Sequence, residues 1–279
     1  MFLTTQLIWL IVIDAYTPTK IVQVMQDGVS TNLTIGGNET IPYGMQPPEI
    51  KPREALGSIT ISLIIAIIIF FLLMKFRARS LIKVWFTFVV FLTISIALTA
   101  LLSKIFPGSL IKLDVIALIL AIPLTFYKIF RRNILVHNAT ELIIYPGLAA
   151  IFVPIMAVWS VIAFLLIISV YDMWAVWKSK FMVSLAKYQM QQVKIFTGFL
   201  VPYMPRKEAL KLKKAQKIKT QRAKVKALRK VKISMALLGG GDVAFPLIFA
   251  GVMLRFGGGL VPALLIVAGA TLGLAGLFL

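Results

Sequence analysis

Apolar runs long enough to cross a membrane recur along this chain of 279 residues. A helix needs about 20 apolar residues to span the hydrocarbon core of a bilayer. Only 14% of the residues are charged, which is low for the surface of a soluble domain, and 59% are hydrophobic. Because a helix satisfies its own backbone hydrogen bonds in lipid, the pattern predicts an all-α, polytopic bundle of transmembrane helices.

The apolar runs predict about eight helices. Residues 2–13 are short for a span, and we interpret them as the remainder of a first helix, with an uncleaved signal peptide as the alternative. The other expected helices cover 56–75, 81–103, 113–130, 135–154, 157–177, 233–254 and 260–279. Four regions follow: 1–55 with the partial first helix and a loop, 56–177 with helices two to six, the segment 178–232, and 233–279 with the last two helices.

Basic residues predict how the helices cross the membrane. The segment 178–232 contains seventeen Lys or Arg residues and one acidic residue, Glu208. Basic residues also follow the second and fourth expected helices, and all three regions fall on one side of the bundle. The positive-inside rule makes that side cytoplasmic and places the loop 14–55 outside. Within this segment, we interpret 208–232 as a basic helical extension lying against anionic lipid headgroups and expect no nucleic-acid binding, because no aromatic residues are interleaved with its basic ones.

The composition excludes several kinds of catalytic site. The chain has no cysteine, so it has no disulfide, thiolate nucleophile or cysteine-based metal site. Its single histidine, His137, excludes a metal site built on several histidines. We therefore expect no metal and no cofactor.

Four acidic residues lie within or at the edges of the expected helices. Asp114 follows Lys112 at a helix end, where an interfacial charge is the simplest interpretation. Glu141 either pairs with a neighbouring helix or lies near the headgroups, and we assign it a structural role. Asp172 and Asp242 are different, because each lies deeper in an apolar run.

The two deeper acids are expected at similar depth. Asp172 precedes Lys178 by six residues, and Asp242 follows Lys232 by ten, where the two lysines mark the cytoplasmic ends of the helices. At about 1.5 Å per residue, the aspartates lie roughly 9 Å and 15 Å from those ends. Their helices are consecutive and antiparallel, so both carboxylates fall in the cytoplasmic part of the bilayer. Each alone costs about 2.5 to 3.5 kcal/mol to insert, so the pairing suggests a shared site.

The sequence around Asp242, residues 237–247, reads LLGGGDVAFPL. Gly239, Gly240 and Gly241 remove side-chain bulk beside the acid, which allows a neighbouring helix or a substrate backbone to approach closely. Pro246 clashes with the carbonyl of Asp242 and further weakens the helix there. Two facing carboxylates without a metal can perform aspartic-protease chemistry, in which the pair shares one proton, one member activates water and the other polarises a peptide carbonyl.

The motifs Tyr171-Asp172 and Gly239-x-Gly241-Asp242, on adjacent helices, resemble those of the presenilin and signal-peptide-peptidase family of intramembrane aspartyl proteases. The segments ISVYDMWAV and LLMKFRARSLIKVW are similar to segments of presenilin, and GDVAFP is similar to the same region of its microbial homologues. The resemblance implies a nine-helix fold with Asp172 and Asp242 as the catalytic pair and with Tyr171 and the three glycines beside the substrate. The substrates it implies are transmembrane segments of other proteins or signal-peptide remnants.

This chain departs from the family in one respect. The family carries a Pro-Ala-Leu motif on its ninth helix, near the active site, whereas Pro262-Ala263-Leu264 lies on the expected eighth helix. We interpret this copy as a coincidence and expect the chain to lack its ninth helix and part of its first. Three other interpretations remain open: a prepilin-peptidase-type protease, a proton- or cation-coupled transporter that uses the buried acids, and acids that only hold helices together. The oligomeric state is not predicted.

Overall fold

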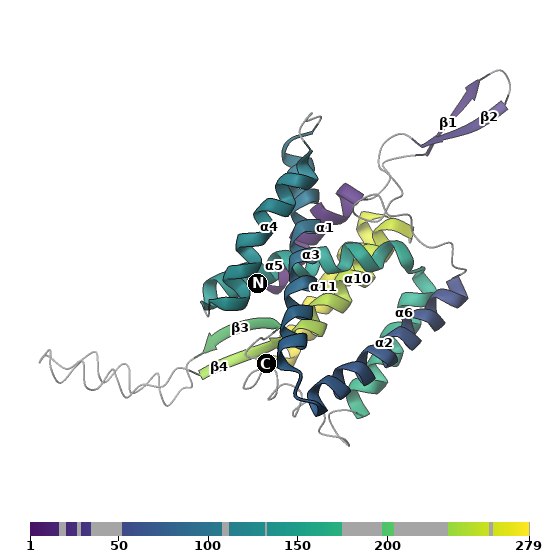
Figure 1. Ribbon diagram of the computed structural model, residues 1–279. Helices are drawn as coiled ribbons and strands as arrows, with labels where there is room; N and C mark the ends of the chain where they lie inside the picture. The colour runs from purple at the N-terminus through teal and green to yellow at the C-terminus, as the bar shows by residue number, and fades with distance from the viewer. Residues whose placement is uncertain are drawn as a thin grey trace, which may run out of the picture.

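The fold is a bundle of α-helices with two small β-hairpin sheets (Figure 1). The structure is a computed structural model, and it describes residues 1–16, 21–26, 29–34, 52–107, 112–131, 133–174, 197–203, 234–256 and 259–278. Eight α-helices lie within this part of the chain. The predicted all-α, polytopic architecture is confirmed, and most of the segment 178–232 lies outside the described residues.

Most expected helices are present close to their expected positions. The helices are α1 (Phe2–Tyr16), α2 (Pro52–Lys75), α3 (Arg79–Ile105), α4 (Leu113–Phe130), α5 (Ile134–Phe152), α6 (Val158–Trp174), α10 (Gly240–Phe256) and α11 (Leu260–Phe278). A 3-10 turn, Val153–Ile155, extends α5. By length and composition, α2, α3, α4 and the extended α5 can each cross a membrane, while α1, α6 and α11 are shorter apolar helices.

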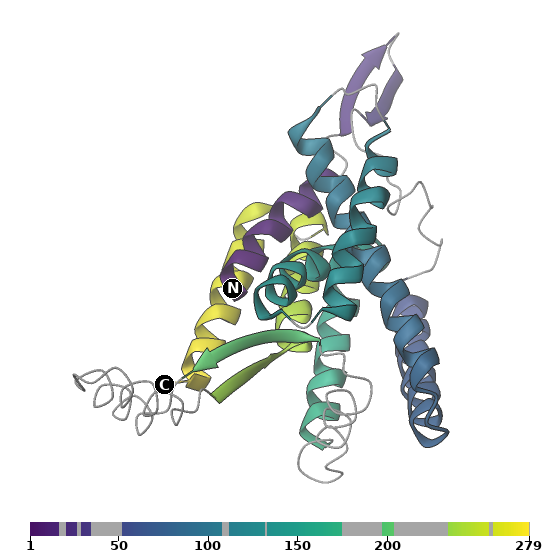
Figure 2. The same cartoon turned by 60° about the vertical axis from the view of Figure 1, so that its left-hand side comes forward.

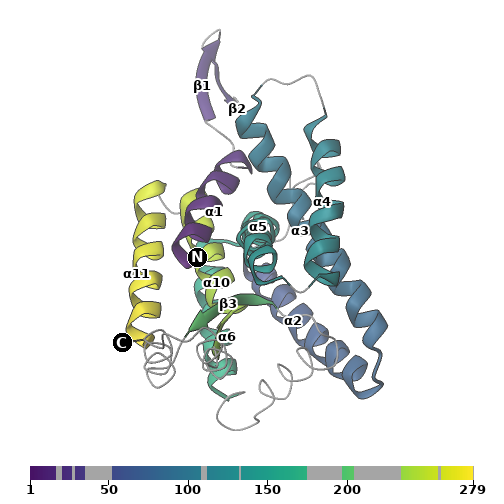
Figure 3. The same ribbon diagram turned by 90° about the vertical axis from the view of Figure 1, so that its left-hand side faces the viewer.

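Helix α5 forms the centre of the bundle. Figure 3 shows it nearly end-on, with α1, α3, α4 and α10 around it, and Figure 1 shows it running across its neighbours. The main hydrophobic core includes the fully buried side chains of Trp9, Val153 and Leu247, from α1, the turn after α5, and α10. Gly251 of α10 permits this packing, because a Cβ at that position would overlap Trp9 and Val153.

The closest helix crossing joins α3 and α5 at Gly147. A Cβ added to Gly147 would overlap the backbone carbonyl of Thr93. A backbone carbonyl cannot rotate away like a side chain, so only a wider separation of the two helices would make room. Small residues at such crossings let helix backbones approach closely in membranes.

Gly147→Ala is therefore expected to destabilise the protein by about 1–3 kcal/mol, the usual cost of overpacking. The matched control is Gly273→Ala on α11, where a Cβ would meet no atom within 4 Å. That control is expected to leave the stability unchanged or raise it, since Ala is the better helix former. Thermal unfolding in detergent micelles measures both. Equal stability of the two variants would contradict the close crossing.

The expected helix 233–254 is wrong in its first part. Residues Ser234–Gly239 form strand β4, which pairs antiparallel with β3 (Gly198–Tyr203), and α10 begins only at Gly240. The run SMALLG is apolar on both sides, and such a run fits a buried strand as well as a helix. Strand β3 also places regular structure inside the segment expected to be a basic loop. A second hairpin, β1 (Ile21–Gln26) with β2 (Val29–Thr34), projects from the other end of the bundle (Figure 2).

Candidate active site

Asp172 and Asp242 lie at one end of the helix pair α6 and α10. Asp172 is in the last described turn of α6, and Asp242 is in the first turn of α10. The two helices are in contact, and deeper in the bundle Phe164 packs edge-on against Phe245 with ring centroids 6.3 Å apart. The carboxylates of Asp172 and Asp242 are close enough to repel one another electrostatically.

The start of α10 determines how Asp242 is held. Asp242 is the third residue of α10, and its carboxylate accepts a hydrogen bond from the backbone N–H of Gly239, the residue just before the helix. This is the backward contact of a capping box, and it satisfies one of the free N–H groups of the helix end. The positive end of the helix dipole also favours a carboxylate there. Asp242 is thus fixed by the helix start, and the expected depth of about 15 Å along a continuous helix does not apply.

The three glycines have separate neighbours. A Cβ at Gly239 would lie 3.0 Å from the carboxylate of Asp242, one at Gly240 would lie 3.0 Å from the Tyr145 hydroxyl, and one at Gly241 would lie 3.0 Å from the Phe245 ring. A Cβ at any of these positions would therefore make a tight contact, and the neighbouring side chain would have to shift by a few tenths of an ångström.

A cavity of about 740 Å³ lies next to this end of α6 and α10. It extends between α2, α3, α5, α6 and α10, and includes Ile168, one turn before Asp172, and Gly241, next to Asp242. Its lining is mainly apolar, and its polar side chains are Ser58, Ser62, Thr93, Glu141, Tyr145 and Thr197. A pocket of this size, apolar with a few polar groups, is typical of a binding site.

Tyr145 brings a polar atom to the cavity beside the glycines. Its side chain is 4% exposed, and its hydroxyl faces the carboxylate of Glu141 and the backbone of Gly240. No atom of the described residues forms a hydrogen bond of normal geometry with that hydroxyl. The cavity therefore contains a polar group with hydrogen-bonding capacity to spare.

A buried ion pair lies on the other side of Tyr145. The ammonium of Lys128, on α4, donates to Glu141, on α5, at 2.5 Å, and both side chains are almost fully buried. His137 lies one turn before Glu141, and its Nε2 is 2.8 Å from the carbonyl of Gly198, the first residue of β3. The N–H of Gly198 donates to Glu141 at 3.4 Å. Of the two positions considered for Glu141, the structure supports pairing with a neighbouring helix.

Asn138 fixes strand β3 against α5. Its side-chain amide accepts a hydrogen bond from the N–H of Leu200 at 3.0 Å and donates one to the carbonyl of Leu200 at 2.8 Å. These two bonds are the pair that a neighbouring strand would form, so Asn138 covers the edge of β3 that β4 does not. Since β4 continues directly into α10, this contact helps to set the position of Asp242.

Asn138→Leu is expected to release this edge of β3. It leaves the Leu200 N–H and carbonyl without their partner, at a cost of about 1–3 kcal/mol for a buried group. We expect faster hydrogen exchange at the Leu200 amide and a lower kcat for the reaction proposed below. Asn138→Asp, which retains the acceptor, is expected to fall between wild type and Asn138→Leu. Unchanged exchange at Leu200 in Asn138→Leu would contradict this role.

The Pro-Ala-Leu sequence at 262–264 lies far from the aspartates. Ala263, on α11, packs in a small cluster with Ala250 and Leu254, which belong to the C-terminal half of α10. Asp242 is at the N-terminal end of α10, so Pro262-Ala263-Leu264 does not line the candidate site. Within the described residues, no three His, Cys, Asp or Glu side chains gather as metal ligands.

Comparison with known proteins identifies the family. The profile of the signal-peptide peptidase and presenilin aspartyl protease family matches residues 40–279. The chain belongs to this family. A solved structure described as a presenilin family intramembrane aspartate protease has the same fold, with a TM-score of 0.55 and 20% sequence identity over 99% of this chain and 87% of that one. No curated protein sequence matches the chain significantly.

Family membership confirms the resemblance noted in the sequence. Both Asp172 and Asp242 fall within the matched residues 40–279. The structural similarity extends over nearly the whole chain and confirms the helical fold. The family profile and the apolar helices together make the chain an integral membrane protein of an aspartyl protease family.

Proposed function

We propose that this protein is an intramembrane aspartyl endopeptidase and that Asp172 and Asp242 are its catalytic pair. The observation that carries the proposal is the position of the two aspartates at the same end of the contacting helices α6 and α10, within electrostatic range of one another. Family membership supports the reaction type. The adjoining cavity supports a substrate site, because apolar walls with a few polar groups suit a stretched transmembrane segment.

In the proposed reaction the pair shares one proton, because two adjacent carboxylates resist being ionised together. The ionised carboxylate takes a proton from a water molecule as the water oxygen attacks the carbon of a peptide carbonyl. The protonated carboxyl donates a hydrogen bond to the carbonyl oxygen and stabilises the charge that develops there. The C–N bond then breaks, and the leaving nitrogen takes up a proton from the pair, which is left with one shared proton as at the start. The roles of the two aspartates are those of a coupled pair and are not divided between them.

The substrates we propose are transmembrane segments of other proteins. The motif residues Tyr171 and Gly241 lie next to the two aspartates, where they would contact a substrate backbone. The excess of Lys and Arg in 178–232 supports a cytoplasmic position for this end of the bundle, with the loop 14–55 outside. Cleavage is therefore expected in the cytoplasmic half of a substrate helix.

The purified protein in proteoliposomes, supplied with a reporter transmembrane peptide, tests this function. We expect two fragments cut within the apolar run. In water labelled with ¹⁸O, one label should enter the new carboxyl group. A peptide analogue with a hydroxyethylene group in place of the amide should inhibit, because it mimics the tetrahedral intermediate. Cleavage abolished by a metal chelator, or resistant to the analogue, would exclude the aspartyl mechanism.

A further inference from the structure

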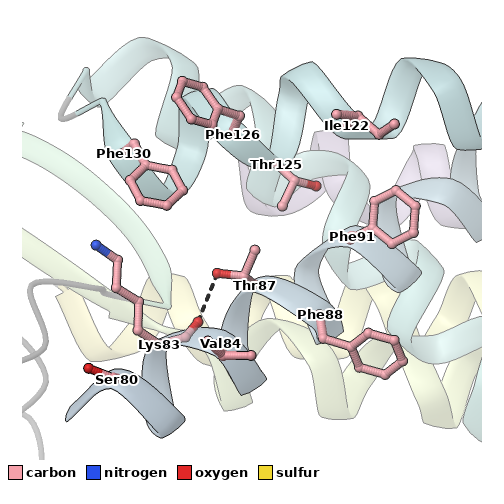
Figure 4. Close-up of a pocket in the computed structure, with 10 residues that line it drawn as sticks. All are labelled: Ser80, Lys83, Val84, Thr87, Phe88, Phe91, Ile122, Thr125, Phe126 and Phe130. Atoms are coloured by element: carbon pink, nitrogen blue, oxygen red, sulfur yellow. Dashed lines mark hydrogen bonds between the residues drawn. The ribbon is translucent and has the colours of Figure 1, made fainter.

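A second cavity lies between α3 and α4, separate from the candidate active site. This α3–α4 groove has a volume of about 590 Å³ and is lined by Lys83, Thr87, Phe88, Thr125, Phe126 and Phe130, among others. Figure 4 shows the two helices facing one another across it. The active-site cavity is lined by Phe86, Val89 and Val90, on another face of α3, so the two cavities share no lining residue.

The groove is amphipathic along its length. Lys83 lies at one end, close to the start of α3, and its ammonium is 4.5 Å from the centre of the Phe130 ring (Figure 4). Beyond it lie apolar side chains, and Phe126 stacks on Phe130 with ring centroids 4.8 Å apart. The groove thus has apolar, largely aromatic walls and a single ammonium group at one end.

The ammonium of Lys83 has no anionic partner in the described part of the chain. The ion pairs found there join Lys104 to Asp14, and Lys128 and His137 to Glu141, and none includes Lys83. Arg79 begins α3 next to Lys83, and Arg131 follows α4, with its guanidinium 5.5 Å from the Tyr127 ring. A positive charge that remains unpaired at the membrane interface favours an anionic ligand there.

A buried polar atom inside the groove also lacks a partner. Thr125 is 4% exposed and lines the groove, and its hydroxyl forms no hydrogen bond with any described atom. A threonine in a membrane helix commonly donates to the carbonyl four residues before it, as Thr87 does to Lys83 at 2.8 Å (Figure 4). Thr125 therefore retains a donor for an oxygen atom that enters the groove.

We propose that the α3–α4 groove is a binding site for one anionic glycerophospholipid. Lys83 holds the phosphate, one acyl chain lies along Phe88, Phe126 and Phe130, and Thr125 donates to an ester oxygen. The occupant is a lipid molecule because the groove combines one ammonium at its end with apolar, aromatic walls, which matches a phosphate headgroup joined to an acyl chain. The excess of basic residues at this end of the bundle assigns the lipid to the cytoplasmic leaflet.

Native mass spectrometry of the purified protein, with phosphatidylglycerol and phosphatidylcholine of the same chains, tests the proposal. We expect wild type to retain one phosphatidylglycerol more strongly than phosphatidylcholine. Lys83→Gln should reduce that preference about fivefold, the effect of one basic group near the headgroups. Lys104→Gln is the matched control, because it lies at the opposite end of α3 and pairs with Asp14. It should retain the wild-type preference.

A second variant tests the acyl-chain part independently. Val84 lines the groove and is 67% exposed, so Val84→Trp can fill the groove without entering the core. It should weaken retention of both lipids, and a wild-type melting temperature would confirm that it folds. A preference unchanged in Lys83→Gln, or reduced equally in Lys104→Gln, would overturn the proposal. Because binding is measured without a substrate, this result is independent of the protease function.

Discussion

Replacement of Asp242 with Asn is expected to lower kcat for cleavage of a transmembrane peptide about 10³-fold, a typical contribution of general acid–base groups. Asn has the shape of Asp but neither accepts a proton from water nor shares one with Asp172. Asp172→Asn should have the same effect, because the two carboxyl groups act as a unit. For the same reason, the double variant should be no less active than either single variant. Initial rates at saturating peptide concentration measure this.

Folding has to be unaffected for this result to bear on catalysis. In the Asp242→Asn variant, the amide oxygen of the new side chain can still accept the hydrogen bond from Gly239, so the melting temperature should remain close to that of wild type. Asp114→Asn is the matched control, since Asp114 is an exposed carboxylate in the first turn of α4. It should cleave at the wild-type rate. Wild-type activity in either single variant of the pair would refute the assignment of the catalytic residues.

The helices were the part of the fold that sequence reasoning could predict best. The run 113–130 has basic and polar flanks at both ends, and α4 has the same bounds, Leu113–Phe130. The helix expected at 233–254 failed at its start because SMALLG has a single polar residue, Ser234, which is too little to reveal its period. The strand β3 had a weak signal in GFLVPY, an apolar run between a glycine and a proline, but the surrounding basic residues dominated the interpretation.

The aspartates could be predicted because an acid in an apolar run is costly and therefore conspicuous. The partners of Glu141 could not be predicted in the same way. Lys128 lies at the end of an apolar run, where a basic residue usually marks the membrane boundary, yet its side chain is 2% exposed and paired with Glu141. Asn138 carries no charge and gives no pattern along the sequence. Only the approach of β3 to α5 explains why an amide is required there.

Replacement of Glu141 with Leu is expected to destabilise the protein by about 3–5 kcal/mol, because it leaves the buried ammonium of Lys128 without a counter-ion. It also removes the acceptor for the Gly198 N–H at the start of β3. Gly198 has a φ of 122°, a backbone conformation that favours glycine. Its N–H and carbonyl contact Glu141 and His137, which hold the start of the strand in this conformation. We therefore expect weaker docking of β3 and, through β4, lower activity. The free energy of unfolding in mixed micelles and kcat measure the two effects.

A double-mutant cycle separates the ion pair from the other contacts. Lys128→Met alone should cost a similar amount, since it leaves the Glu141 carboxylate buried and unpaired. The double variant, Lys128→Met with Glu141→Leu, removes both charges and should be more stable than either single variant. The coupling energy should therefore exceed the roughly 0.5 kcal/mol that distant sites show. If the two losses simply add, Lys128 and Glu141 do not stabilise one another, and the position of β3 depends mainly on Asn138 and His137.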